Sequence, residues 1–171
     1  MEERKGLITM KGSPLTLLGN AVEVGETAPD FEVLDNDLSP VKLSTFHGKV
    51  RIISSVPSLD TTVCDTMTRR FNQEANGLGE DVVVLTISMD LPFAQKRWCG
   101  AAGIKRLQTL SDHHKASFGK AFGILIKELR LLARAVFVVD KDGIIRYTQI
   151  VNELTNEPDY EAALNAAKQL V

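Results

Sequence analysis

The chain has 171 residues, which is enough for one domain with a full hydrophobic core. Its apolar fraction of 44% and charged fraction of 25% are typical of an ordinary soluble globular protein. The net charge of −2 provides no global positive field that would attract nucleic acid or an anionic membrane. We therefore predict a single domain over residues 1–171 that binds neither nucleic acid nor membrane.

The N-terminus lacks the basic-then-apolar layout of a secretory signal. No apolar run approaches the roughly 20 residues that a membrane-spanning helix needs, and the longest, 131–139, is interrupted by Arg134. Two cysteines are too few for a secreted disulfide scaffold. We therefore expect a cytoplasmic protein, in which the cysteines are either two buried small hydrophobes or a working redox pair.

Hydrophobic periodicity and turn residues predict the elements in chain order. The first is a hairpin of strands 7–10 and 15–18, within an N-terminal extension of residues 1–20. After it we expect strands at 31–34, 41–43, 50–55, 82–87, 135–139 and 144–150. A first helix should start near Thr62, with Thr62 as its cap, and a second should end near 102, with Asp90 as its cap and Pro92 in its first turn. Two further helices are expected at 115–122 and 160–170.

The core of this pattern is strand, helix, strand, helix, strand hairpin and final helix. A right-handed crossover makes the first two core strands parallel, and the closing hairpin adds antiparallel strands. We therefore predict an α/β protein with a thioredoxin-like fold, in which helices flank a central mixed sheet and an N-terminal β-hairpin forms an extension.

Cys64 falls in the first turn of the helix that follows strand 50–55. Unpaired N–H groups and the positive end of the helix dipole favour an anion there, and the thiolate is the reactive form of cysteine. Cys64 also belongs to an apolar stripe with helical spacing, which continues through Met67, Phe71, Ala75 and Leu78. The spacing alone is therefore equally consistent with a reactive thiol and with an inert core cysteine.

The loop before Cys64 has the form P-x-x-x-T-x-x-C, with Pro57 and Thr61 at the fixed positions. The Thr61 hydroxyl can reach back to the thiolate or to a bound oxygen, and Pro57 can shield the sulfur from water without presenting an N–H. This pattern resembles the peroxidatic loop of peroxiredoxins, and residues 55–72 resemble the thiol peroxidase branch, the atypical two-cysteine peroxiredoxins. The resemblance covers nearly the whole chain and extends to segments 9–20, 24–31, 90–99, 131–140 and 158–164.

The resemblance implies a peroxidase that reduces hydrogen peroxide and organic hydroperoxides. Cys64 would become a sulfenic acid, and Cys99 would resolve it as an intrachain disulfide. The resemblance further implies recycling by thioredoxin, a homodimer, and no metal or organic cofactor. One departure is Trp98, which stands where the branch usually has phenylalanine.

Arg134 precedes the predicted strand 135–139, which runs antiparallel to strand 50–55 in this fold. Its start should therefore lie at the same end of the sheet as the Cys64 loop, where a guanidinium can favour the thiolate and bind peroxide oxygens. The alternative is an arginine that only extends from an apolar segment to solvent. The resemblance assigns Arg134 the catalytic role.

The same fold and thiol chemistry allow two rival functions. A thiol–disulfide oxidoreductase needs C-x-x-C at the helix start, but Met67 stands three residues after Cys64. A peroxide-sensing thiol protein that relays oxidation to a partner stays open. Because Cys64 and Cys99 are placed on different helices with a strand between them, we predict Cα atoms more than about 7 Å apart in the reduced protein, so that one helix must loosen for the disulfide to form.

Overall fold

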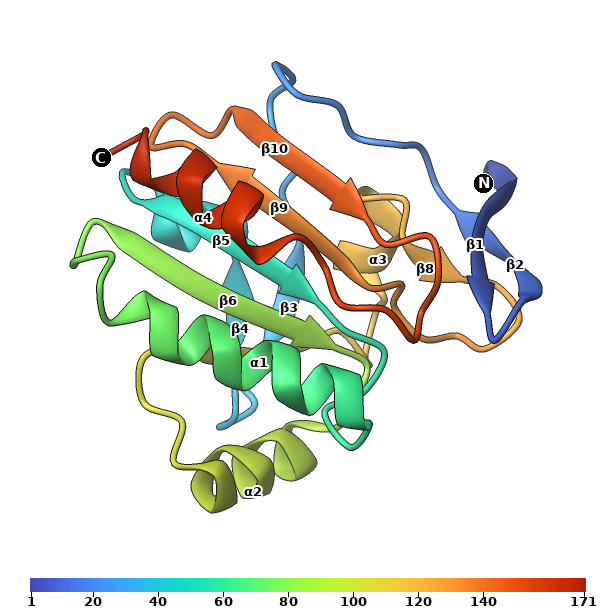
Figure 1. Ribbon diagram of the computed structural model, residues 1–171, viewed down its shortest axis with the longest axis horizontal. Helices are drawn as coiled ribbons and strands as arrows, with labels where there is room; N and C mark the ends of the chain where they lie inside the picture. Colours follow the sequence, from blue (N-terminus) through green and yellow to red (C-terminus); the bar gives the residue numbers. More distant parts are fainter.

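The computed structural model describes all 171 residues, and its centre is a seven-stranded mixed sheet with the order β10-β9-β5-β6-β7-β3-β4 (Figure 1). Its strands are β3 (Glu32–Leu34), β4 (Pro40–Lys42), β5 (Val50–Ser55), β6 (Val82–Ser88), β7 (Gln108–Ser111), β9 (Ala135–Val139) and β10 (Ile145–Ile150). Strand β5 is parallel to β6, and β6 is parallel to β7. Strand β9 is antiparallel to both β5 and β10.

The register of β5 and β9 determines which loops of the protein lie close together. Ser55, the last residue of β5, pairs with Ala135, the first residue of β9. The loop that leaves β5 and the residue that precedes β9 therefore meet at one end of the sheet, as the predicted topology requires.

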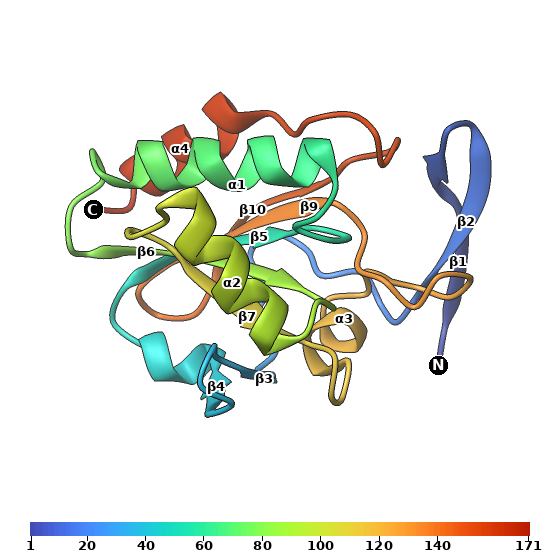
Figure 2. The same cartoon turned by 90° about the horizontal axis from the view of Figure 1, so that it is seen from below.

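Helices cover both faces of the sheet. Helices α1 (Thr62–Ala75) and α4 (Tyr160–Lys168) lie side by side on one face, and the short α3 (Ser117–Ala121) lies on the other (Figure 2). Helix α2 (Pro92–Ala102) packs against β7, and a 3-10 turn (Leu43–Phe46) follows β4. All six residues of β5 are buried, as expected for a strand with helices on both faces.

Each face of the sheet has its own hydrophobic core. Ile52 of β5 belongs to the cluster beneath α1 and α4, together with Met67 and Phe71. Its neighbour Ile53 belongs to the opposite cluster, because successive side chains of a strand point to opposite faces. That second cluster contains Phe118 and other phenylalanines in edge-to-face contact.

The N-terminal hairpin pairs β1 (Glu3–Met10) with β2 (Ser13–Leu18), and β8 (Leu125–Ile126) adds a third strand. This small sheet stands beside the end of the main sheet where β5 ends and β9 begins (Figure 1). Ile8 and Leu17 are buried in the main core, so the hairpin is packed onto the domain.

The thioredoxin-like fold with its hairpin extension is confirmed, but four local expectations were wrong or missing. Strands β7 and β8 were not predicted, because they are only four and two residues long. The cap of α1 is Thr61 rather than Thr62, and it makes no side-chain capping bond. The cap of α2 is Leu91 rather than Asp90, whose carboxylate is used elsewhere. None of the helices is both long and apolar enough to cross a membrane.

Candidate active site

Cys64 is the third residue of α1, and its side chain has no exposed surface. It packs in the core cluster beneath α1, so its place on the apolar stripe is confirmed. Its Sγ atom also accepts a hydrogen bond from Nη1 of Arg134 at 3.3 Å. An inert core cysteine packs against apolar side chains and gains nothing from a guanidinium, so this contact favours the interpretation of Cys64 as a reactive thiol.

Arg134 is the residue directly before β9, and only 2% of its surface is exposed. Its Nε and Nη2 atoms donate to the carbonyl oxygen of Leu154 at 2.9 and 2.7 Å. Two bonds to one oxygen fix the plane of the guanidinium and direct Nη1 towards the sulfur. Arg134 takes part in none of the salt bridges in the protein. A buried charge needs a partner, and Nη1 of Arg134 faces the Cys64 Sγ at 3.3 Å and the Met67 Sδ at 3.7 Å.

A pocket of about 460 Å³ opens beside Arg134. Pro57 lines it and is itself buried. The other walls come from the start of α1, the hairpin tip, the loop between β8 and β9 and the loop after β10, and they include Met10, Lys11, Thr61, Val63, Leu129, Leu131 and Leu154. A hydroperoxide can enter this pocket with its polar end at Arg134 and any alkyl group against the apolar walls.

Thr61 lies at the edge of this pocket, but its hydroxyl does not contact the sulfur. The hydroxyl donates instead to the carbonyl of Ser58 at 3.0 Å, and the residue is exposed. The predicted contact between Thr61 and the thiolate is therefore not formed in this structure. The bond to Ser58 shapes the loop that leads into α1.

Asp90 holds the same loop from the neighbouring strand, a role that sequence reasoning missed. Its carboxylate accepts from the Ser58 hydroxyl at 2.7 Å, from the backbone N–H of Leu59 at 2.9 Å and from the Ser88 hydroxyl at 2.7 Å. The signal was present in the sequence, because Asp90 follows a buried strand parallel to β5. Loops after parallel neighbouring strands lie at the same end of a sheet.

Cys99 is half-buried on α2, and both cysteines are free. Its Sγ lies 3.3 Å from the Thr109 hydroxyl, which itself donates to Oδ1 of Asn36 at 3.0 Å. Since a hydroxyl has one proton, Cys99 must donate its S–H to Thr109. The two cysteines are thus free thiols, and each sulfur has a different partner.

Trp98 connects the helices that carry the two cysteines. Its indole Nε1 donates to Oδ1 of Asp65 on α1 at 2.9 Å, and Arg69 lies over its ring at 5.6 Å. The histidines take no part in this region, and no three His, Cys, Asp or Glu side chains gather as they would around a metal ion.

Comparisons with known proteins agree with this geometry. The redoxin family model matches residues 23–164. The chain is 62% identical over 161 residues to a thiol peroxidase of Halalkalibacterium halodurans, covering 94% of this chain and 96% of the relative. It is 60% identical over 164 residues to a thiol peroxidase of Bacillus subtilis, covering 96% and 98%. A crystal structure of a peroxiredoxin-like protein from Aquifex aeolicus superposes with a TM-score of 0.91 at 40% identity, over 98% of this chain and 99% of that one. The chain therefore belongs to the redoxin family and groups there with the thiol peroxidases.

Proposed function

We propose that this chain is a thiol-dependent peroxidase in which Cys64 is the peroxidatic cysteine. The observation that carries the proposal is the hydrogen bond from Arg134 to the Cys64 sulfur, made by a buried guanidinium without a carboxylate partner. Such a cation favours the thiolate, which is the nucleophile that peroxide reduction needs. The relatives named thiol peroxidase support the same activity.

The first step oxidises Cys64 and reduces the peroxide. The thiolate forms a bond with the terminal peroxide oxygen while the O–O bond breaks, and water or an alcohol leaves after taking up a proton. The Nη groups of Arg134 stabilise the charge that moves onto the leaving oxygen, while Pro57 limits the access of water. Thr61, at the pocket edge, orients the bound peroxide rather than the resting thiol. The apolar walls support organic hydroperoxides as substrates beside hydrogen peroxide.

The second step forms an intrachain disulfide with Cys99. The Cys99 sulfur attacks the sulfenic sulfur of Cys64, the S–O bond breaks, and the oxygen leaves as water with the proton that Cys99 gives up. A disulfide requires Cα atoms within about 7 Å. The two sulfurs contact different partners, Arg134 and Thr109, which supports the prediction that a helix opens locally at this step.

The catalytic cycle closes when an external dithiol reduces this disulfide. We infer that thioredoxin supplies the dithiol, that the chain acts as a homodimer without metal or organic cofactor, and that it works in the cytoplasm. The half-buried position of Cys99 supports access by a protein reductant once α2 has opened.

Stopped-flow peroxide consumption with thioredoxin tests the assignment on the wild type, Cys64→Ser and Cys99→Ser. We expect Cys64→Ser to lose at least about a thousandfold in rate, because no thiolate remains beside Arg134. Cys99→Ser should reduce one equivalent of peroxide at the normal rate and then stop. Appreciable turnover by Cys64→Ser would contradict the proposal. A wild type that reacts once but is not recycled by dithiols would instead indicate a peroxide sensor.

A further inference from the structure

The orientation of Arg134 depends on a single backbone oxygen. The Leu154 carbonyl accepts both bonds that fix the guanidinium plane. Leu154 belongs to a loop after β10 rather than to a helix or strand of the main sheet. The position of this loop therefore decides where Nη1 points, and a loop must be held by other contacts to serve that purpose.

Strand β1 of the hairpin supplies the backbone part of this support. Thr9 pairs with Glu153 as an isolated parallel bridge. The Thr9 N–H donates to the carbonyl of Asn152 at 2.8 Å, and the Leu154 N–H donates to the carbonyl of Thr9 at 2.9 Å. The peptide unit on each side of Glu153 is thus bonded to the hairpin.

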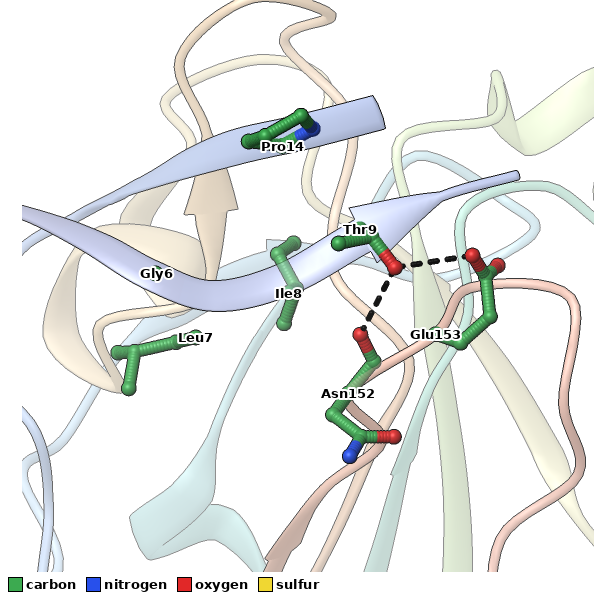
Figure 3. Close-up of a pocket in the computed structure, with 7 residues that line it drawn as sticks. All are labelled: Gly6, Leu7, Ile8, Thr9, Pro14, Asn152 and Glu153. Atoms are coloured by element: carbon green, nitrogen blue, oxygen red, sulfur yellow. Dashed lines mark hydrogen bonds between the residues drawn. The ribbon is translucent and has the colours of Figure 1, made fainter. Parts of the chain in front are cut away.

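The Glu153 carboxylate supplies the side-chain part. One oxygen accepts from the Thr9 hydroxyl at 2.9 Å and from the backbone N–H of Gly12 at 3.0 Å. The other accepts from the backbone N–H and the hydroxyl of Thr155, at 2.9 and 2.8 Å. Figure 3 shows the Thr9 hydroxyl between the Asn152 carbonyl and this carboxylate. One side chain therefore ties the hairpin tip to both flanks of Leu154.

The hydrogen-bond donors around the Glu153 carboxylate favour its ionised form. The N–H of Thr155, and after it the N–H of Gly12, lower the pKa of Glu153 from its usual 4.5 to about 2. The carboxylate then offers acceptors only, which is what four converging donors require.

We propose that Glu153, with Thr9, is a positioning residue of the peroxidase site: it holds the Leu154 carbonyl that aims Arg134 at Cys64. This inference rests on the proposed roles of Cys64 and Arg134. The hairpin precedes residues 23–164, the part that matches the redoxin family. The hairpin, which lies outside the region that matches the family, thus positions Arg134, which lies inside that region.

Glu153→Gln is the sharpest test, because it keeps the size of the side chain but places an NH₂ group against donors. We expect the second-order rate of Cys64 oxidation to fall about threefold to tenfold, the effect of losing a typical hydrogen bond or two. The pH profile for alkylation of Cys64 by iodoacetamide should move to higher pH, because a misdirected Arg134 favours the thiolate less. Glu3→Gln is the matched control: Glu3 contacts Lys127 from the far end of the same strand, and its loss should leave both readouts unchanged.

A double-mutant cycle separates positioning from general stability. If Glu153 acts through Arg134, Glu153→Gln should slow oxidation little further in the Arg134→Lys background. Thr9→Val should slow oxidation as Glu153→Gln does, and Thr9→Ser, which restores the hydroxyl, should rescue the rate. An undiminished effect in the Arg134→Lys background would overturn the inference, as would a loss of thermal stability with an unchanged rate and alkylation profile. Alkylation needs no peroxidase turnover, so it tests this anchor even if Cys64→Ser contradicted the proposed function.

Discussion

The helices that carry the two cysteines differ in how firmly they are attached. Helix α1 buries five residues, Cys64, Met67, Thr68, Phe71 and Ala75. Helix α2 buries only Pro92 and Gln95, and it exposes Phe93 at 67%. Elements with few buried apolar contacts open at a lower free energy than core elements. In the proposed cycle, α1 would therefore build the peroxide site, and α2 would provide the movement that brings Cys99 to it.

The largest expected effect concerns how much a side chain of each helix contributes to the free energy of unfolding of the protein. Phe71→Ala in α1 should lower the free energy of unfolding by about 3–5 kcal/mol, because it leaves a cavity in a closed core. Phe93→Ala in α2 should change it by less than about 0.5 kcal/mol, since the ring is largely in solvent. Urea denaturation of the reduced protein measures both. Similar losses for the two variants would break the comparison.

The next effect concerns the oxidation step at α1. Arg134→Lys keeps the charge but loses the planar fork on the Leu154 carbonyl, so Cys64 oxidation should slow at least about tenfold, or roughly 1.4 kcal/mol. The rate at which Cys99 then forms the disulfide should change far less. Stopped-flow oxidation and quenched alkylation measure the two steps separately. A normal oxidation rate together with a sharp fall in thermal stability would make Arg134 a structural residue.

A smaller effect is expected at the contact between the helices. Trp98→Phe keeps an aromatic ring but removes the hydrogen bond to Asp65, so disulfide formation should become about threefold faster. Lys96→Met is the control, because it removes only an exposed ion pair between α2 and Asp37. Slower resolution by Trp98→Phe would mean that the contact aligns the helices instead of restraining them.

The smallest effect concerns the hydrogen bond between Cys99 and Thr109. Thr109→Val removes the acceptor of its S–H and should speed disulfide formation by about twofold, whereas Thr109→Ser should not. Quenched alkylation after one equivalent of peroxide measures this. An equal acceleration in both variants would point to altered packing and not to the lost hydroxyl.

Sequence reasoning predicted correctly those features for which a side-chain pattern could be combined with a rule about how strands and helices connect. The position of Cys64 at a helix start followed from strand, loop and stripe, and the approach of Arg134 followed from antiparallel pairing of its strand with β5. The contacts that hold Arg134 in place were not predictable in this way. The Leu154 carbonyl belongs to the backbone, and every residue has one. Glu153 and Thr9 are 144 positions apart in the chain, with no local pattern that relates them.

Trp98 is the only tryptophan of the chain, and it precedes Cys99 while its indole bonds to the residue that follows Cys64. The protein therefore carries an intrinsic fluorescent reporter between its two cysteines. If α2 opens as proposed, the indole should lose both Asp65 and the Arg69 cation, and enter a more aqueous environment. Its emission should then shift to longer wavelength as the disulfide forms and return when a dithiol reduces it. A single unlabelled sample could in this way follow the complete catalytic cycle in real time.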